Sequence, residues 1–80
     1  MADYISLRQI KVGESLTVHH VGGVAEMKRR LEDLGVVEGT KITCLGKSPL
    51  GDPRAYLIRS AVIALRNRDA ETVLGMGDAP

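Results

Sequence analysis

The chain is poor in aromatic residues and in the cysteines whose disulfides or metal sites usually stabilise small proteins. It contains no tryptophan, no phenylalanine, two tyrosines and a single cysteine, Cys44, among 80 residues. A lone cysteine excludes an intramolecular disulfide framework, and no spacing of histidine and cysteine resembles a closed zinc site. Because a chain this short buries only about 60–65% of its unfolded surface, a small aliphatic core must hold the fold together.

An excess of charge of one sign is also missing. Eleven basic and ten acidic side chains give a formal net charge of +1, which is not the footprint of a nucleic-acid-binding protein. The first residues lack the basic and apolar regions of a signal peptide, and no window approaches the roughly 20 apolar residues that cross a bilayer. We therefore predict one cytoplasmic domain formed by residues 1–75, followed by a disordered tail at 76–80.

Signatures of catalysis and of cofactor binding are absent as well. The sequence contains no G-x-S-x-G motif, no P-loop and no recognisable pair of catalytic carboxylates. Gly22 and Gly23 precede a predicted helix, but they lack the lysine and the spacing of a phosphate-binding loop, which favours a plain turn. The sequence predicts neither an enzyme nor a cofactor.

His19, His20 and Cys44 are the only soft metal-ligand candidates. Adjacent residues of a strand point to opposite faces, so the two histidines are not expected to bind one ion together. In the favoured interpretation, Cys44 is a small core residue and one histidine is simply solvated. No metal site is predicted.

The clearest helix is predicted from Val24 to Leu34. Its apolar residues recur at spacings of three, four and three, which lines one helix face, and Gly35 follows where a left-handed cap is needed. On the other face, oppositely charged side chains lie four residues apart, so we expect the basic run at 28–30 to be neutralised. The expected pairs are Glu26 with Arg30, Lys28 with Glu32, and Arg29 with Asp33.

Period-two alternation and strand-favouring residues predict about five short strands. Ser6 and Gln9 fit a capping box for one helical turn before the first strand, and Asn67 is expected to cap a second turn that runs through Glu71. Five strands and one amphipathic helix favour a small, mostly antiparallel β-barrel, because closure removes exposed edges. The strands are expected at 15–21, 40–45, 54–59, 61–66 and 72–74.

A loop bracketed by two prolines is the most informative local feature. Pro49 and Pro53 fix their own φ angles and favour extended geometry in the preceding residues, whereas Gly51 permits a turn. Leu50 would be held on a stiff loop, which lowers the entropy lost on docking, and we interpret the loop as an interaction site. The alternative is a structural crossing in which Leu50 folds into the core and Asp52 caps the turn.

Two segments together resemble one protein family. The first runs from residue 31 to residue 45 and contains the Leu34-Gly35 corner, and the second is Ser48-Pro-Leu-Gly-Asp-Pro53. With Ala-Leu-Arg at 64–66 and Asp-Ala-Glu at 69–71, these segments are similar to the FeoA family of ferrous iron transport accessory proteins, over about residues 7–73. The resemblance implies an SH3-like small β-barrel. Two positions depart from the family pattern. Ser60 stands where the family commonly has glycine in the hairpin, and the neutral Ser48 stands before Pro49, where the family usually has a charged residue.

The resemblance also implies a function. Such a protein would be a non-enzymatic cytosolic partner of the membrane transporter FeoB, whose cytosolic part contains a GTP-binding domain, and would regulate ferrous iron uptake through a protein–protein interface. Two alternatives stay open: stimulation of GTP hydrolysis by Arg29 or Arg30, and an SH3-like regulatory module related to metal-dependent repressors. The predicted partner-binding residues are Leu34, Gly35, Pro49, Leu50, Gly51, Asp52 and Pro53.

Overall fold

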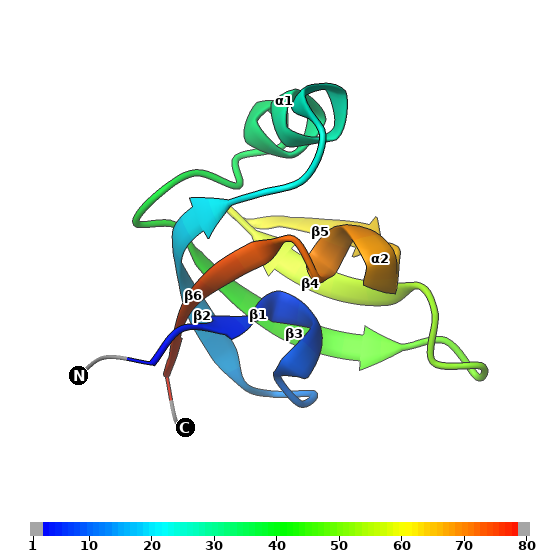
Figure 1. Ribbon diagram of the computed structural model, residues 1–80. Helices are drawn as coiled ribbons and strands as arrows, with labels where there is room; N and C mark the ends of the chain where they lie inside the picture. Colours follow the sequence, from blue (N-terminus) through cyan, green and yellow to red (C-terminus); the bar gives the residue numbers. More distant parts are fainter. Residues whose placement is uncertain (1–2, 79–80) are drawn as a thin grey trace.

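The computed structural model describes residues 3–78, which form one six-stranded sheet in the order β1-β6-β2-β3-β4-β5. Every neighbouring pair of strands is antiparallel (Figure 1). The strands are β1 (Ile5–Ser6), β2 (Ser15–Val21), β3 (Lys41–Lys47), β4 (Arg54–Ile58), β5 (Ala61–Leu65) and β6 (Val73–Asp78), and the helices are the 3₁₀ helix η1 (Leu7–Gln9), α1 (Ala25–Asp33) and α2 (Asn67–Ala70).

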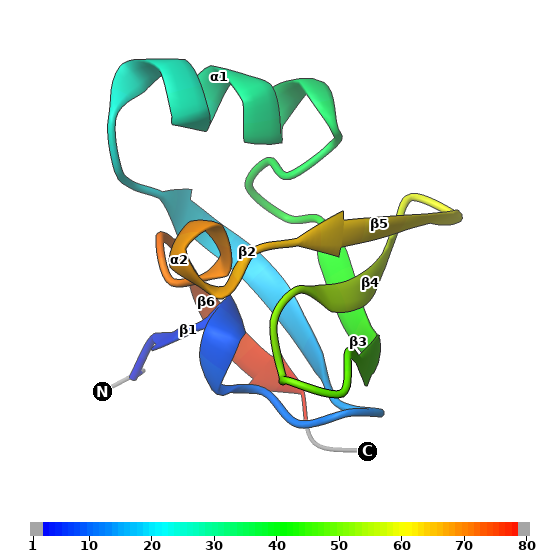
Figure 2. The same cartoon turned by 90° about the vertical axis from the view of Figure 1, so that its right-hand side faces the viewer.

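The sheet curls because its central strand is irregular. Strand β2 pairs with β3 along one edge and with β6 along the other, and the β2–β6 register shifts between Val18 and His20. A second shift lies between Cys44 and Gly46 in the β3–β4 pair. Bulges of this kind bend a strand and increase its twist. In Figures 1 and 2, α1 stands beyond the end of β2, whereas α2 lies beside the curled sheet.

The core is aliphatic except for Cys44 and one tyrosine, as the composition predicts. Leu16 and Val18 of β2 and Ile42 and Cys44 of β3 alternate inward and are fully or almost fully buried. Tyr56 of β4 is the largest fully buried side chain. The other buried apolar residues are Leu7, Ile10, Val21, Leu31, Val36, Ile58, Leu65, Ala70 and Val73.

Helix α1 ends as predicted, but its surface charges are arranged differently. The Val36 N–H donates to the Leu31 carbonyl and the Gly35 N–H donates to the Glu32 carbonyl, which is the Schellman arrangement with a left-handed glycine. The predicted ion pairs within the helix are wrong: among residues 3–78, no ion pair joins two α1 side chains. Exposed pairs at this spacing gain only a few tenths of a kcal/mol, so α1 leaves these long side chains in solvent.

The first and the last strand along the chain differ from the sequence prediction. Ile5 and Ser6 form a short strand against β6, although only the helical turn after them was predicted. The predicted disordered tail is wrong for residues 76–78, because β6 extends to Asp78 and pairs with β2. Ala79 and Pro80 lie outside the described residues. The predicted capping box of Ser6 and Gln9 is present, and within it the Ser6 N–H donates to Gln9 Oε1 at 2.8 Å.

The β4–β5 hairpin turns through two residues with positive φ. Arg59 has φ 49° and Ser60 has φ 69°, the values of a two-residue type I′ turn, which normally contains glycine or asparagine. The left-handed conformation costs an ordinary side chain roughly 1–2 kcal/mol. Ser60, the departure from the family pattern, therefore sits in a strained backbone conformation.

Replacing Ser60 with glycine is expected to stabilise the protein by about 1 kcal/mol, because glycine adopts this φ without steric cost. For a domain of this size the melting temperature should rise by about 4–8 °C, measured by circular dichroism. Gly39→Ala is the reciprocal control, since Gly39 has φ 89° and nothing lies within 4 Å of a Cβ built on it. An unchanged or lower melting temperature for Ser60→Gly would contradict the assigned turn.

Candidate functional site

The proline-bracketed loop presents Leu50 to solvent. Its side chain is 94% exposed, the highest value among the exposed large apolar residues of the described chain. Two backbone hydrogen bonds close the loop: the Ser48 N–H donates to the Pro53 carbonyl at 3.1 Å, and the Gly51 N–H donates to the Ser48 carbonyl at 2.8 Å. The predicted exposure of Leu50 is confirmed, and the alternative in which it folds into the core is wrong.

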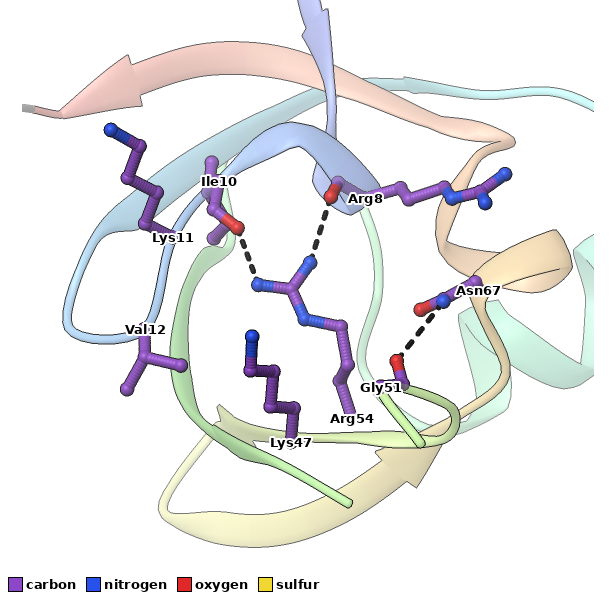
Figure 3. A pocket seen from close by; sticks show the side chains of 8 residues that line it. All are labelled: Arg8, Ile10, Lys11, Val12, Lys47, Gly51, Arg54 and Asn67. Carbon is purple, nitrogen blue, oxygen red and sulfur yellow. Dashed lines mark hydrogen bonds between the residues drawn. The ribbon is translucent and has the colours of Figure 1, made fainter. Parts of the chain in front are cut away.

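Helix α2 fixes this loop from the side. Asp52 Oδ1 accepts the Asn67 N–H at 2.9 Å. Asn67 Nδ2 donates to the Gly51 carbonyl at 3.1 Å (Figure 3). Asp52 therefore binds the first turn of α2 instead of capping its own loop. The prediction that Asn67 is the N-cap is wrong, because Arg66 occupies the N-cap position and Asn67 begins the helix. The loop owes its stiffness to these tertiary hydrogen bonds as well as to its prolines.

The Leu34-Gly35 corner lies away from the loop. Leu34 is partly buried against the core, and a Cβ built on Gly35 would come within 2.8 Å of Arg59 Cδ in the β4–β5 turn. That turn follows the C-terminal end of β4, whereas the loop precedes its N-terminal end. A five-residue strand is about 16 Å long. The structure thus separates the two groups of predicted partner-binding residues instead of joining them in one patch.

The two arginines proposed to contact a nucleotide site are both exposed, but they differ in their surroundings. Arg30 Nη2 lies 3.8 Å from Asp69 Oδ2, a carboxylate that is otherwise buried. Arg29 has no ion pair within residues 3–78. Of the two, Arg29 is the side chain that a partner would meet without breaking an existing ion pair.

The three soft metal-ligand candidates do not converge. Both histidines are exposed, since the bulge in β2 interrupts the usual alternation, and the His19 ring stacks on Tyr4 at a centroid distance of 4.2 Å. Cys44 is fully buried in the core. In the described part of the chain, no three side chains of histidine, cysteine, aspartate or glutamate gather in a group that could hold a metal ion.

Arg54 is the most unusual buried side chain, and the sequence analysis missed it. It is only 9% exposed, yet its guanidinium binds no carboxylate: Nη1 donates to the Arg8 carbonyl at 2.7 Å, and Nη2 donates to the Ile10 carbonyl (Figure 3). Nη2 also donates to Cys44 Sγ. Two of these partners are main-chain carbonyls more than 40 residues away, and the third is a thiol. No local sequence pattern predicts such contacts.

Tyr56 shares this interior with Arg54. The arginine Cζ lies 5.7 Å from the centroid of the tyrosine ring, a distance compatible with a cation–π contact. Burial raises the pKa of the Tyr56 hydroxyl, and the positive charge of Arg54 opposes part of that rise. Tyr56 therefore stays neutral throughout the physiological range and acts as a core residue.

A second exposed apolar group lies on the outer side of the sheet. Leu57 of β4 and Val62 of β5 are cross-strand partners, and Leu45 of β3 is also exposed. We call these three residues the outer patch. Strands β3 and β4, which carry two of them, are the strands that the Leu50 loop connects. The apolar surface of the molecule is therefore not limited to Leu50.

None of the helices within residues 3–78 has the length and apolar character needed to cross a membrane.

Comparison with protein families gives one match that spans most of the chain. The FeoA domain model matches residues 5–75. A fusion of Fe(2+) transport protein A and the Fe(2+) transporter FeoB from Porphyromonas gingivalis is 30% identical over 67 residues, which are 84% of this chain and 8% of that protein. The chain thus spans less than a tenth of the length of this relative.

Comparison with solved structures supports the fold. A FeoA-like protein from Clostridium acetobutylicum superposes with a TM-score of 0.84 at 31% identity, covering 92% of this chain and 86% of that one. FeoA from Stenotrophomonas maltophilia, a prokaryotic SH3 domain protein solved with zinc, gives a TM-score of 0.76 at 27% identity, covering 92% and 89%. The predicted mainly β, SH3-like fold is confirmed, with six strands in place of about five.

Proposed function

This chain belongs to the FeoA domain family, and on that premise we propose that it is a non-enzymatic accessory protein that binds and regulates the cytosolic part of a FeoB-type ferrous iron transporter. The P. gingivalis relative joins Fe(2+) transport protein A and FeoB in one polypeptide. Covalent linkage raises the effective concentration of two modules that work together. The fusion therefore supports association between a separate FeoA protein and its transporter.

The exposure of Leu50 carries this proposal. A leucine that is 94% exposed gains no free energy from the core, so burying it against a partner would remove apolar surface from water. The hydrogen bonds that Asn67 donates to Asp52 Oδ1 and to the Gly51 carbonyl hold the loop before binding, which reduces the entropy lost on association. Leu50 has the properties of an interface anchor, while the distant Leu34-Gly35 corner serves to end α1.

The outer patch would extend such an interface. Leu57 and Val62 lie opposite one another on β4 and β5, and both strands present apolar side chains without charge on that face. Interfaces concentrate their affinity in a few apolar anchors surrounded by weaker contacts. We assign the anchor to Leu50 and the surrounding contacts to the outer patch.

Truncating Leu50 to alanine is expected to weaken binding to the isolated cytosolic part of the transporter about tenfold or more, as for other interface anchors. The loss of an exposed side chain should leave the melting temperature within a degree or two. Biolayer interferometry measures the first effect and circular dichroism measures the second.

Val24→Ala is the matched control for this experiment, because Val24 is also an exposed aliphatic residue but precedes α1, far along the chain from the loop. Equal affinities for Leu50→Ala and the unchanged protein would remove Leu50 from the interface. A large fall in melting temperature would show that the loop has a structural role that the exposed side chain does not reveal.

Stimulation of GTP hydrolysis is the second candidate function, and the free Arg29 is the observation that favours it. An arginine supplied in trans can stabilise the charge that develops during phosphoryl transfer. The hydrolysis rate of the transporter, measured with this protein and with its Arg29→Ala variant, separates this function from the adaptor role. If the rate of GTP hydrolysis does not change when the protein is added, only the adaptor function remains.

A further inference from the structure

Strand β5 forms one edge of the sheet, and within residues 3–78 no strand pairs with it on the side away from β4 (Figure 2). The other edge strand, β1, is only two residues long, whereas β5 extends over Ala61–Leu65. Helix α1 does not cover β5, because Ala61, Val62 and Ala64 are all exposed, Val62 to 67%. The sheet therefore ends in an open edge of five residues.

The turn before β5 determines which of its backbone groups are free. In a two-residue hairpin, the residues that flank the turn are hydrogen-bonded to each other, and here they are Ile58 and Ala61. Hydrogen-bonded and non-hydrogen-bonded pairs alternate along an antiparallel ladder, so the next residue of β5 that bonds to β4 is Ile63. The N–H and C=O groups of Val62 and Ala64 point away from β4. We call these groups the free edge.

Strand β5 carries none of the features that usually protect an edge strand. Natural edge strands are very short, bulged, or interrupted by proline or by charged side chains. The sequence Ala-Val-Ile-Ala-Leu contains neither proline nor charge, and its pairing with β4 runs without a register shift. An exposed apolar edge of this kind is suited to accept an extended segment as a further strand.

Positive charge lies at both ends of the free edge. Arg59 precedes β5 and Arg66 follows it, and both are exposed and have no ion pair within residues 3–78. From Pro53 to Arg68 the chain contains four arginines and no acidic residue. One of the four, Arg54, is buried. The edge is therefore apolar along its length and basic at its ends.

A cleft of about 450 Å³ adjoins the Arg66 end of this edge, between α1 and the residues that follow β5. Three arginines and two acidic residues line it, together with one valine and one methionine. One of the acidic residues, Asp69, lies 3.8 Å from Arg30 and 4.0 Å from Arg68, so those two arginines are already partly neutralised. Arg66 is the arginine of the cleft whose charge is available to a partner.

We propose that the free edge binds an extended acidic segment of a partner protein as an added strand. The backbone of the segment bonds to Val62 and Ala64, and carboxylates at its two ends pair with Arg59 and Arg66. Charge complementarity suppresses wrong partners and fixes the register. It also disfavours a second copy of the chain, because antiparallel pairing of two β5 strands about Ile63 brings the arginines of both copies together without an acidic residue between them.

Fluorescence anisotropy with a labelled synthetic peptide tests the free edge. The probe alternates valine and threonine between two aspartates at each end. One control peptide carries lysine in place of aspartate, and a second has N-methylated backbone amides. We expect the probe to bind saturably, and both controls to bind about tenfold more weakly or worse, because they lose the charge pairs or the backbone hydrogen bonds.

Val62→Pro blocks the free edge in the protein itself. The Val62 N–H points away from β4, so proline removes a donor that the hairpin does not use. Circular dichroism checks that the variant is folded. It should bind the probe about tenfold more weakly or worse, whereas Val62→Thr, which keeps the N–H and the branched shape, should bind it unchanged. If Val62→Pro does not fold, the N-methylated peptide decides the same question.

Arg66→Gln tests the charge at the end of the edge. It should weaken binding of the probe about threefold, as for an exposed ion pair. Arg29→Gln changes an arginine of α1 that is likewise exposed and has no ion pair among the described residues, and it should leave the affinity unchanged. Leu50→Ala should bind the probe like the unchanged protein, so failure at the free edge and failure of the transporter contact are distinguishable.

Four results would overturn the proposal. They are absence of saturable binding, equal affinity for the probe and either control peptide, equal affinity of Val62→Pro and Val62→Thr when both are folded, and equal affinity of Arg66→Gln and Arg29→Gln. Analytical ultracentrifugation without peptide adds a fifth. A dimer that Val62→Pro dissociates would make a second copy of the chain the occupant of the edge.

Discussion

Replacing Gly75 with alanine is expected to lower the free energy of unfolding by about 3 kcal/mol or more, at the upper end of overpacking effects. Gly75 lies in β6 between β1 and β2, opposite Ile5 on one side and Val18 on the other. A Cβ built on it would come within 2.1 Å of the Thr17 carbonyl oxygen. Because a backbone atom cannot rotate away as a side chain can, relief would require the β2–β6 pair to separate.

Gly46→Ala is the matched control for this substitution. Gly46 also lies in a strand, its φ is not positive, and nothing lies within 4 Å of a Cβ built on it. Alanine there should be neutral or slightly stabilising, because it restricts the unfolded chain. Chemical denaturation of both variants gives the comparison. If Gly75→Ala and Gly46→Ala were equally stable, the close approach of β6 to β2 would be wrong.

Gly75 also shows why sequence patterns missed one end of the sheet. The segment Gly-Met-Gly-Asp resembles a flexible tail, since glycine lowers strand propensity and no alternation of apolar residues remains. In the structure these glycines are what lets β6 approach its neighbours: Gly75 meets the backbone of β2, and Gly77 lies beside Ile5. A glycine selected by steric fit and one in a loose tail look identical until the neighbouring strand is known.

The elements defined by their own periodicity were predictable. Helix α1, strand β2 and the β4–β5 hairpin occur close to the expected residues. The predicted apolar face of the helix is only partly buried, because Leu31 is buried whereas Val24 is exposed, and β5 buries only Leu65. Exposure of Leu50 was predictable for a local reason too, because two prolines restrict the loop and Gly51 permits its turn. Contacts between residues that are distant in sequence were not predictable. Asp52 caps a helix 15 residues away, and only the strand register pairs Lys47 with Arg54.

Replacing Arg54 with alanine is expected to destabilise the protein by about 3 kcal/mol, because it leaves two main-chain carbonyls without their donor. Those carbonyls, of Arg8 and Ile10, belong to η1 and the residue that ends it, so the packing of this turn against β4 should loosen as well. Equilibrium unfolding in urea measures the effect. Arg29→Ala removes the same side chain at an exposed position without an ion pair and should change stability by less than about 0.5 kcal/mol.

The effect of Arg54 lies in its geometry more than in its charge, and Arg54→Lys separates the two. Replacing a buried charged group with an apolar one is often harmless when its charged partner is removed too, but here the partners are backbone carbonyls that no substitution removes. Lysine keeps the positive charge yet lacks the planar fork that reaches the carbonyls of Arg8 and Ile10 together with Cys44 Sγ. We therefore expect Arg54→Lys to lose more than half of the stability that Arg54→Ala loses. Near-complete recovery with lysine would show instead that a positive charge alone suffices at this position.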